Sequence, residues 1–140
     1  MKIAIIGGTG LYDTSFLRDP EEKIIDTEYG QTKVYVSKID DREIIFLPRH
    51  GIQHGVLAYQ VNYHANMKAL EQLGVKRAIA MNAVGSLNPE MKVGDLVLID
   101  QFMDFAWNRE STFHGRYTWQ IGSTRNICIL DYFLASTAFL

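Results

Sequence analysis

The sequence predicts an α/β domain in which a mixed β-sheet is flanked by helices. Three observations support this prediction: an apolar strand ends in a glycine-rich turn, two strand-like runs form a hairpin, and an amphipathic helix precedes further strands. Hairpin strands are antiparallel, whereas strands joined through a helix run parallel, so the sheet must be mixed. With 140 residues, 47% of them hydrophobic and 21% charged, the chain has the composition of one globular domain that can build its own core.

The first strands are identified by apolar runs that end in turn residues. Residues 3–6 are continuously apolar and mostly β-branched, which is typical of a strand buried on both faces, and residues 7–10 follow as a tight glycine-rich loop. Residues 33–37 and 43–47 are two further strand-like runs, separated by a short polar stretch that suits a hairpin turn. Pro48 should end the second of them.

The middle of the chain contains the clearest helix. Its apolar residues recur at helical spacing: Val61, Ala65, Ala69, Leu70 and Leu73. Gly74 follows as a C-terminal cap. Residues 77–81 and 95–100 then read as strands, and the apolar stretch 127–140 is compatible with a strand or a short helix.

Charge and cysteine content exclude several classes of protein. Fourteen Lys and Arg against sixteen Asp and Glu give a net charge of −2, which argues against a nucleic-acid-binding protein. The single cysteine, Cys128, cannot form an intramolecular disulfide or a zinc-binding cluster. No secretory signal is evident, and no run approaches the roughly 20 apolar residues of a membrane span. We therefore expect a soluble, cytoplasmic protein that binds no membrane.

The glycine-rich loop after the first strand has the composition of an anion-binding turn. Gly7, Gly8, Thr9 and Gly10 offer backbone amides and a hydroxyl without side-chain bulk. The loop lacks the third glycine of a dinucleotide fingerprint, where Asp13 stands instead, and it lacks the Lys-Ser/Thr pair of a P-loop. A plain strand-terminating turn therefore remains the alternative interpretation.

A second polar loop follows the hairpin. Arg49 and His50 stand beside Gly51, so a guanidinium and an imidazole are placed where the backbone can approach a dianionic ligand. The alternative is a solvated turn with His54 packed against a neighbouring segment. His50 and His54 have the spacing of paired metal ligands, but no third ligand accompanies them, so we expect no metal site.

Residues 82–86 form a third loop of small residues at the end of a strand. Loops at the carboxyl ends of parallel strands meet in one crevice, where α/β folds bind ligands. We therefore expect the three loops to surround one oxyanion. Asn62 and Tyr63, at the start of the helix, should face this cluster and are candidates for contacts with a sugar.

Taken together, these motifs resemble the purine nucleoside phosphorylase and 5′-methylthioadenosine phosphorylase family, and within it the branch that acts on methylthioadenosine or methylthioinosine. The resemblance extends from residue 2 to about residue 118. Its segments are residues 6–11, Arg49 to Gly51 with Gln53 and His54, residues 61–66, residues 82–87, and residues 94–95 leading into 99–102. It implies the phosphorylase/hydrolase-like form of the α/β fold.

The resemblance also implies a reaction and a set of residues. Inorganic phosphate, as co-substrate, attacks the anomeric carbon of a purine nucleoside and yields the free base and a (methylthio)ribose 1-phosphate, with no metal or organic cofactor. The residues it assigns to phosphate are Thr9, Arg49, His50, Asn82 and Ala83, and those it assigns to substrate are Asn62 and Tyr63. It further implies a homotrimer or homohexamer.

Two departures from the family pattern divide the chain. Family members are longer, and their later half supplies the sugar-binding loop, a further phosphate-binding threonine and the group that protonates the purine. From about Trp119 the sequence diverges, and Gln120 stands where the family has a histidine. We therefore expect residues 1–118 to be the N-terminal half of a phosphorylase domain and residues 119–140 a divergent tail, as in a frameshifted or truncated gene. The alternative function is a catalytically incomplete fragment that binds phosphate or associates with full-length subunits.

Overall fold

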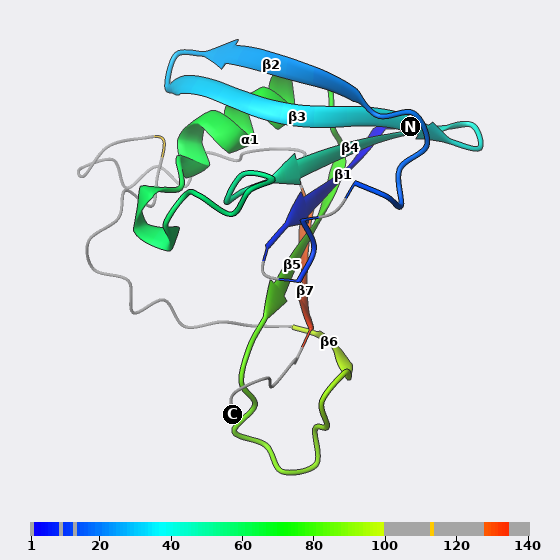
Figure 1. Ribbon diagram of the computed structural model, residues 1–140, viewed down its shortest axis with the longest axis vertical. Helices are drawn as coiled ribbons and strands as arrows, with labels where there is room; N and C mark the ends of the chain where they lie inside the picture. Colours follow the sequence, from blue (N-terminus) through cyan, green and yellow to red (C-terminus); the bar gives the residue numbers. More distant parts are fainter. Residues whose placement is uncertain (1, 9, 13, 100–112, 114–127, 135–140) are drawn as a thin grey trace.

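The computed structural model describes residues 2–8, 10–12, 14–99, 113 and 128–134, the last segment by its backbone alone. Within these residues the chain forms a seven-stranded mixed sheet of order β2-β3-β4-β1-β5-β7-β6 (Figure 1). Its strands are β1 (Lys2–Gly7), β2 (Glu21–Thr27), β3 (Gly30–Ile39), β4 (Arg42–Pro48), β5 (Arg77–Ala83), β6 (Leu96–Leu98) and β7 (Cys128–Leu134). A 3₁₀ turn, η1 (Ala58–Gln60), and a helix, α1 (Tyr63–Gln72), connect β4 to β5. The predicted mixed α/β sheet is confirmed.

The central strands run parallel and end on the same side of the sheet, with β5 extending past the end of β1. β1 pairs in parallel with β4 on one side and with β5 on the other, and β7 continues the parallel set beyond β5. The register aligns Gly7 with Pro48 and Ile6 with Ala80. We call the side of the sheet where Gly7, Pro48 and Ala83 end these strands the carboxyl end. The opposite side, where Lys2 pairs with Glu43, is the amino end.

One face of the sheet is covered by α1. The buried residues on this face come from four strands, the helix and the turn after it: Ala4, Val34, Ile45, Leu47, Leu70, Val75 and Ala78. Asn62 caps the helix by accepting the backbone N–H of Ala65, 3.0 Å away. Gly74 ends it with φ of 75°, a conformation that favours glycine. The predicted helix and its C-terminal cap are therefore confirmed.

The other face is covered by the segment that follows β1. Leu17 packs there with Ile44 and Phe46, and the ring of Phe16 stands edge-on to that of Phe46 at a centroid distance of 5.3 Å. Alternate residues of β4 thus enter two different cores. β1 likewise places Ala4 in the first core, whereas Ile3 and Ile5 pack against the second. The continuous apolar run of β1 is explained because both of its faces are covered.

The predicted hairpin is confirmed as β3 and β4, and Asp40 takes a φ of 52° in its turn. β2 was not predicted; it lies at one border of the sheet and alternates between exposed and half-covered residues. The last predicted strand before residue 100 is shorter than expected, because Asp95 accepts the backbone N–H of Lys92 in a turn and β6 begins only at Leu96. The stretch 127–140 contains β7, a strand rather than a helix.

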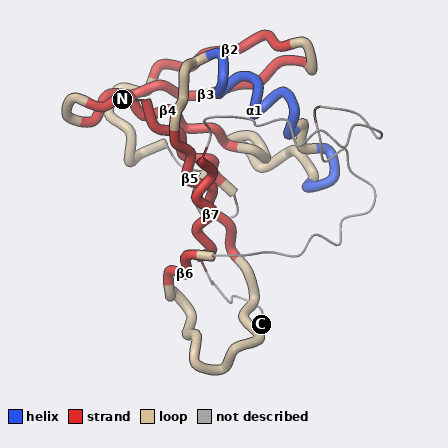
Figure 2. Tube along the Cα trace, turned by 180° about the vertical axis from the view of Figure 1, so that it is seen from behind, coloured by secondary structure: helices blue, strands red, loops and turns tan. Residues whose placement is uncertain are grey.

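The sheet has two differently packed parts. Figures 1 and 2 show α1 lying against the β2–β3 side, while β5, β7 and β6 continue away from it toward the long connection between β5 and β6. That connection exposes large apolar side chains, among them Leu87 and Val93. No helix among the described residues is long and apolar enough to cross a bilayer.

Candidate functional site

The carboxyl end of the sheet brings the loop after β1, the loop after β4 and the end of β5 together. The backbone N–H of Arg49 donates to the carbonyl of Gly7 (3.2 Å), and its Nη1 donates to the carbonyl of Met81 on β5 (3.1 Å). Since β1 lies between β4 and β5, the arginine side chain reaches across the end of β1. One residue therefore contacts all three segments. The sequence predicted that the loops after these strands converge, whereas the contact on this side is made to β5 itself, ahead of the predicted loop 82–86.

Gly8 permits this path of the arginine side chain. A Cβ atom added at Gly8 would lie 2.5 Å from Cζ of Arg49, well inside van der Waals contact. The guanidinium is thus stacked directly on the backbone of the glycine-rich loop. Gly7 is equally confined, since a Cβ there would lie 2.5 Å from the carbonyl oxygen of Leu11 and 2.7 Å from the ring of Phe46. Gly8 thus makes room for the side chain of Arg49, and Gly7 makes room for the Leu11 carbonyl and the core residue Phe46.

His50 orients the arginine. Its side chain is buried, with 7% of the residue exposed, and Nδ1 donates to the carbonyl of Val56 at 2.9 Å. Its Nε2 accepts the Nε–H of Arg49 at 3.1 Å. A carbonyl only accepts and a guanidinium only donates, so these bonds place the proton on Nδ1 and leave the ring neutral. The imidazole therefore fixes the plane of the guanidinium in this state.

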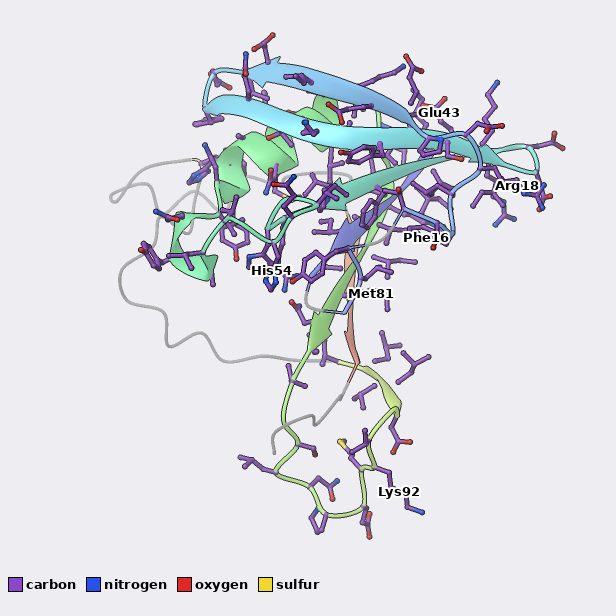
Figure 3. The ribbon with its side chains drawn as sticks, viewed as in Figure 1. Phe16, Arg18, Glu43, His54, Met81 and Lys92 are labelled. Carbon is purple, nitrogen blue, oxygen red and sulfur yellow. The ribbon has the colours of Figure 1, made fainter. Side chains whose placement is uncertain are left out.

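His54 and Tyr12 make a second contact between the two loops. The Tyr12 hydroxyl lies 2.9 Å from Nε2 of His54, and the two rings stack at a centroid distance of 4.4 Å with an interplanar angle of 29°. The His50 ring stands edge-on to that of His54, with centroids 5.2 Å apart. In Figure 3 the labelled His54 lies at the opposite end of β4 from Glu43. The interpretation of His54 as packed against a neighbouring segment is confirmed, and its partner Tyr12 lies directly after the glycine-rich loop.

The chemistry of this cluster suits an anion. It combines a guanidinium with the backbone of a glycine-rich loop, and both recur where proteins bind phosphate. Within the part of the chain that the structure describes, no three His, Cys, Asp or Glu side chains lie together as a metal site requires. The side chains of His50 and His54 are engaged with Arg49, Val56 and Tyr12 instead.

The other predicted site residues have different surroundings. Thr9 lies outside the described residues. Asn82 and Ala83 are half-buried and end β5 directly after Met81, whereas the sequence predicted them in a loop that follows the strand; their assignment to phosphate stays a prediction. Tyr63 is 38% exposed at the start of α1.

Asn62 has a clear structural role. Its Oδ1 caps α1, and its Nδ2 donates to the carbonyl of Tyr29, 2.7 Å away in the β2–β3 turn. Both ends of its amide are thus used within the fold, joining the helix to the hairpin. Its assignment to substrate, like that of Tyr63, stays a prediction.

Three groups at this site were not predicted: the carbonyls of Met81 and Val56, and the side chain of Tyr12. Every residue has a carbonyl, so sequence composition cannot show which ones will hold an arginine or a histidine. Tyr12 had a usable signal, because it is an aromatic residue directly after the glycine-rich loop, where a ring can cover a polar site.

Comparison with known proteins gives consistent matches. The family model of the Phosphorylase superfamily matches residues 2–140. The chain is 50% identical over 114 residues to a probable 6-oxopurine nucleoside phosphorylase from Dictyoglomus turgidum, covering 81% of this chain and 43% of that protein. It is 47% identical over 116 residues to the S-methyl-5′-thioadenosine phosphorylase of Thermofilum pendens, covering 81% of this chain and 44% of the relative.

A solved structure matches as well. The methylthioadenosine phosphorylase from Schistosoma mansoni in complex with adenine superposes with a TM-score of 0.77 and 38% sequence identity, over 82% of this chain and 42% of the other. The chain therefore spans less than half the length of the relatives that it matches. The mixed sheet described above is the fold of this part of those proteins.

Proposed function

This chain belongs to the phosphorylase superfamily, and we propose that the cluster at the carboxyl end of its sheet binds inorganic phosphate for the phosphorolysis of a purine nucleoside. The observation that carries the proposal is the position of Arg49. Its guanidinium lies on the backbone of Gly8 and is held there by the carbonyl of Met81 and by His50. A guanidinium fixed in this way presents a planar fork to a tetrahedral oxyanion.

The proposed reaction needs positioning more than reactive side chains. A phosphate oxygen attacks the anomeric carbon of the nucleoside, the bond from that carbon to the purine nitrogen breaks, and its electron pair leaves with the base. The transition state resembles a ribosyl cation, and a dianion held directly beneath it stabilises the developing charge. Inorganic phosphate is the co-substrate, and the proposed chemistry uses no metal or organic cofactor.

The remaining site residues would complete the phosphate shell. We assign the Thr9 hydroxyl, the amides of the glycine-rich loop and the backbone N–H of Ala83 to the phosphate oxygens, with Asn82 beside them. Such amides supply fixed dipoles that need no reorganisation when charge develops. Asn62 and Tyr63 are assigned to the nucleoside, and Asn62 also holds the start of the helix in place.

The substrate class follows from the relatives. Those described above are a probable 6-oxopurine nucleoside phosphorylase and phosphorylases of S-methyl-5′-thioadenosine. We therefore propose 5′-methylthioadenosine, 5′-methylthioinosine or another purine nucleoside as substrate, in a cytoplasmic homotrimer or homohexamer. Because the chain covers 43% of the first relative, its catalytic activity is proposed for an assembly that also contains the rest of that domain.

The test is phosphate-dependent release of the purine. The chain is assayed alone and co-expressed with the remaining part of a homologous phosphorylase, using 5′-methylthioadenosine, 5′-methylthioinosine and inosine. Free adenine or hypoxanthine should appear only when phosphate is present, and Arg49→Ala should abolish it. Purine release that continues without phosphate would instead indicate hydrolysis and would reject phosphorolysis.

A second candidate function is phosphate binding without catalysis. The observation that favours it is that the described Arg49–His50–Gly8 cluster lies wholly within the 140 residues. Calorimetric titration of the chain with inorganic phosphate separates the two candidates. Saturable binding by a chain that releases no purine in either assay would support the binding function alone.

A further inference from the structure

Tyr12 and His54 lie beside the groups assigned to phosphate without being among them. The pair spans 42 positions of sequence and joins the loop after β1 to the loop after β4 through a hydrogen bond and a ring stack. His54 is exposed and neither residue belongs to the buried set of either core. The contact therefore contributes little to the core and connects the two loops that carry Gly8 and Arg49.

The backbone of His54 supports a role for this contact. Its φ is 52°, in the left-handed region that side chains with a Cβ seldom adopt. Gly51, with φ of 73°, and Gly55 stand close by, so glycine is the expected residue for such a turn. What distinguishes His54 from Asp40, which has the same φ, is that its ring meets Tyr12 and His50 at the polar cluster.

The ring contacts join two segments of the site. Tyr12 follows the turn in which the Leu11 N–H donates to the Gly8 carbonyl at 2.9 Å, so its position is tied to that of the glycine-rich loop. His54 is tied to the other loop, since its N–H donates to the carbonyl of Gly51 at 3.1 Å. The stacked pair is therefore a further tie between the two loops, in addition to the bond from the Arg49 N–H to the Gly7 carbonyl.

We propose that Tyr12 and His54 are positioning residues, which hold the glycine-rich loop against the Arg49 loop and thereby set the affinity of the site for phosphate. This inference rests on the proposed function. Phosphate must be contacted from both loops at once, so two loops held by this further contact bind it better than loops joined only through Arg49 and the ends of β1 and β4. Neither side chain needs to touch the anion for this effect.

The experiment uses His54→Gly in the full chain, with two measurements: the dissociation constant for inorganic phosphate by calorimetry and the Tm. Glycine accepts the φ of His54 without strain, so the Tm should stay equal or rise. Loss of the ring should nevertheless weaken phosphate binding about tenfold, because the preorganised spacing is lost. Tyr12→Phe keeps the stack and removes the hydroxyl, and we expect a smaller weakening, about threefold.

Asp40→Gly is the matched control. Asp40 has the same φ of 52° but lies in the β3–β4 turn at the amino end of the sheet. Its replacement should likewise preserve or raise the Tm while leaving the phosphate dissociation constant unchanged. A stability gain in both variants, with an affinity loss in only one, would separate positioning of the site from relief of backbone strain.

The possible failures are distinct. If wild-type chain binds phosphate and His54→Gly binds it equally well, the positioning role is wrong and the proposed function stands. If His54→Gly lowers the Tm and weakens binding in parallel, the pair is merely structural and the inference is also wrong. If wild-type chain gives no saturable heat with phosphate, the proposed function fails, and the positioning role fails with it.

Discussion

The two ends of the β1–β4 pair are built from the same strands in one register, yet they hold charged groups in different ways. At the amino end, Lys2 and Glu43 form an ion pair with Nζ and Oε1 2.8 Å apart, and their side chains are 41% and 30% exposed. At the carboxyl end, Arg49 is bonded to a neutral imidazole and to a backbone carbonyl. The ion pair neutralises the charges of Lys2 and Glu43, whereas the contacts at the carboxyl end fix the orientation of the Arg49 guanidinium.

The difference follows from what lies at each end. The amino end closes with a short turn through Asp40 and Asp41, and its ionic groups remain in contact with water, where pairing is worth little. At the carboxyl end the segments after β1 and β4 meet the end of β5. The side chain of Arg49 therefore has to pass close to the backbone of a neighbouring segment. Gly8 and the buried His50 are signs of this close packing. What distinguishes the carboxyl end is the fixed orientation of its polar groups and not the number of its charges.

The strongest test of this comparison replaces one arginine at each end of β4. Arg49→Ala should weaken phosphate binding by about 30-fold to 1000-fold, because a charge-assisted bidentate contact is worth about 2–4 kcal/mol. Arg42→Ala, at the other end of the same strand, removes an equal charge and should leave the dissociation constant unchanged. Calorimetric titration of both variants with inorganic phosphate measures the difference.

Arg49→Lys sharpens the same test. Lysine keeps the positive charge but has no planar fork and no Nε–H for His50 to accept, so binding should remain weakened by at least about tenfold. Equal losses in Arg49→Ala and Arg42→Ala would contradict the comparison, since they would show that net charge alone attracts the anion.

Most of the fold could be predicted because it depends on patterns of apolar residues. The runs in β1 and β4 are apolar on both faces, and each face enters a separate core. α1 follows from the four-residue spacing that buries Ala65 and Ala69. β2 escaped prediction because a strand at the border of a sheet needs no fully buried face; four of its seven residues are exposed, so no apolar alternation stands out.

The candidate site could be predicted only in part. Arg49 and His50 have side chains whose chemistry is visible in the sequence, and glycines beside them suggested close approach. The direction of the guanidinium depends on the carbonyl of Met81, which lies 32 positions away and belongs to a residue with an apolar side chain. That contact exists only because β5 pairs next to β1, so it follows from topology and not from local sequence.

The next largest effect is expected from Gly8→Ala. The new Cβ would meet the guanidinium of Arg49, which is the end of a flexible side chain and can move away. We therefore expect the Tm to change little and phosphate binding to weaken about tenfold through misplacement of the arginine. Gly55→Ala is the matched control, because a Cβ there meets nothing within 4 Å. The Tm and the phosphate dissociation constant are measured for both variants. Equal phosphate affinities in Gly8→Ala and Gly55→Ala would show that the close approach of Arg49 to Gly8 has no consequence for binding.

A smaller effect, on stability, is expected at Asn62. Asn62→Ala removes the cap of α1 and the bond to the Tyr29 carbonyl, and should lower the free energy of unfolding by about 1 kcal/mol. Asn62→Asp keeps the oxygen that caps α1, so its free energy of unfolding should fall by less than that of Asn62→Ala. Urea unfolding monitored by circular dichroism measures both. Nucleoside turnover that is unchanged in Asn62→Asp, measured with the remaining part of a homologous phosphorylase present, would place this residue with the fold alone. A large loss of turnover in that variant would assign it to the substrate site as well.

The smallest effect is expected at the amino end, where charge pairing alone acts. Hydrogen bonding to Lys2 lowers the pKa of Glu43 below the usual glutamate range, although partial burial opposes the shift. A carboxylate whose pKa is lowered by folding stabilises the protein at pH values above the pKa of the unfolded chain, and this contribution is lost as the pH falls through the lowered value.

Glu43→Gln should therefore show a slightly lower Tm than wild type at neutral pH, and the two Tm values should converge in acid below the usual glutamate range. Glu90→Gln, which removes an exposed carboxylate from the long β5–β6 connection, controls for net charge. Phosphate affinity should be the same in both variants at neutral pH. If Glu43→Gln instead weakened phosphate binding, the two ends of the β1–β4 pair would be coupled, and the separation between charge pairing and ligand orientation would not hold.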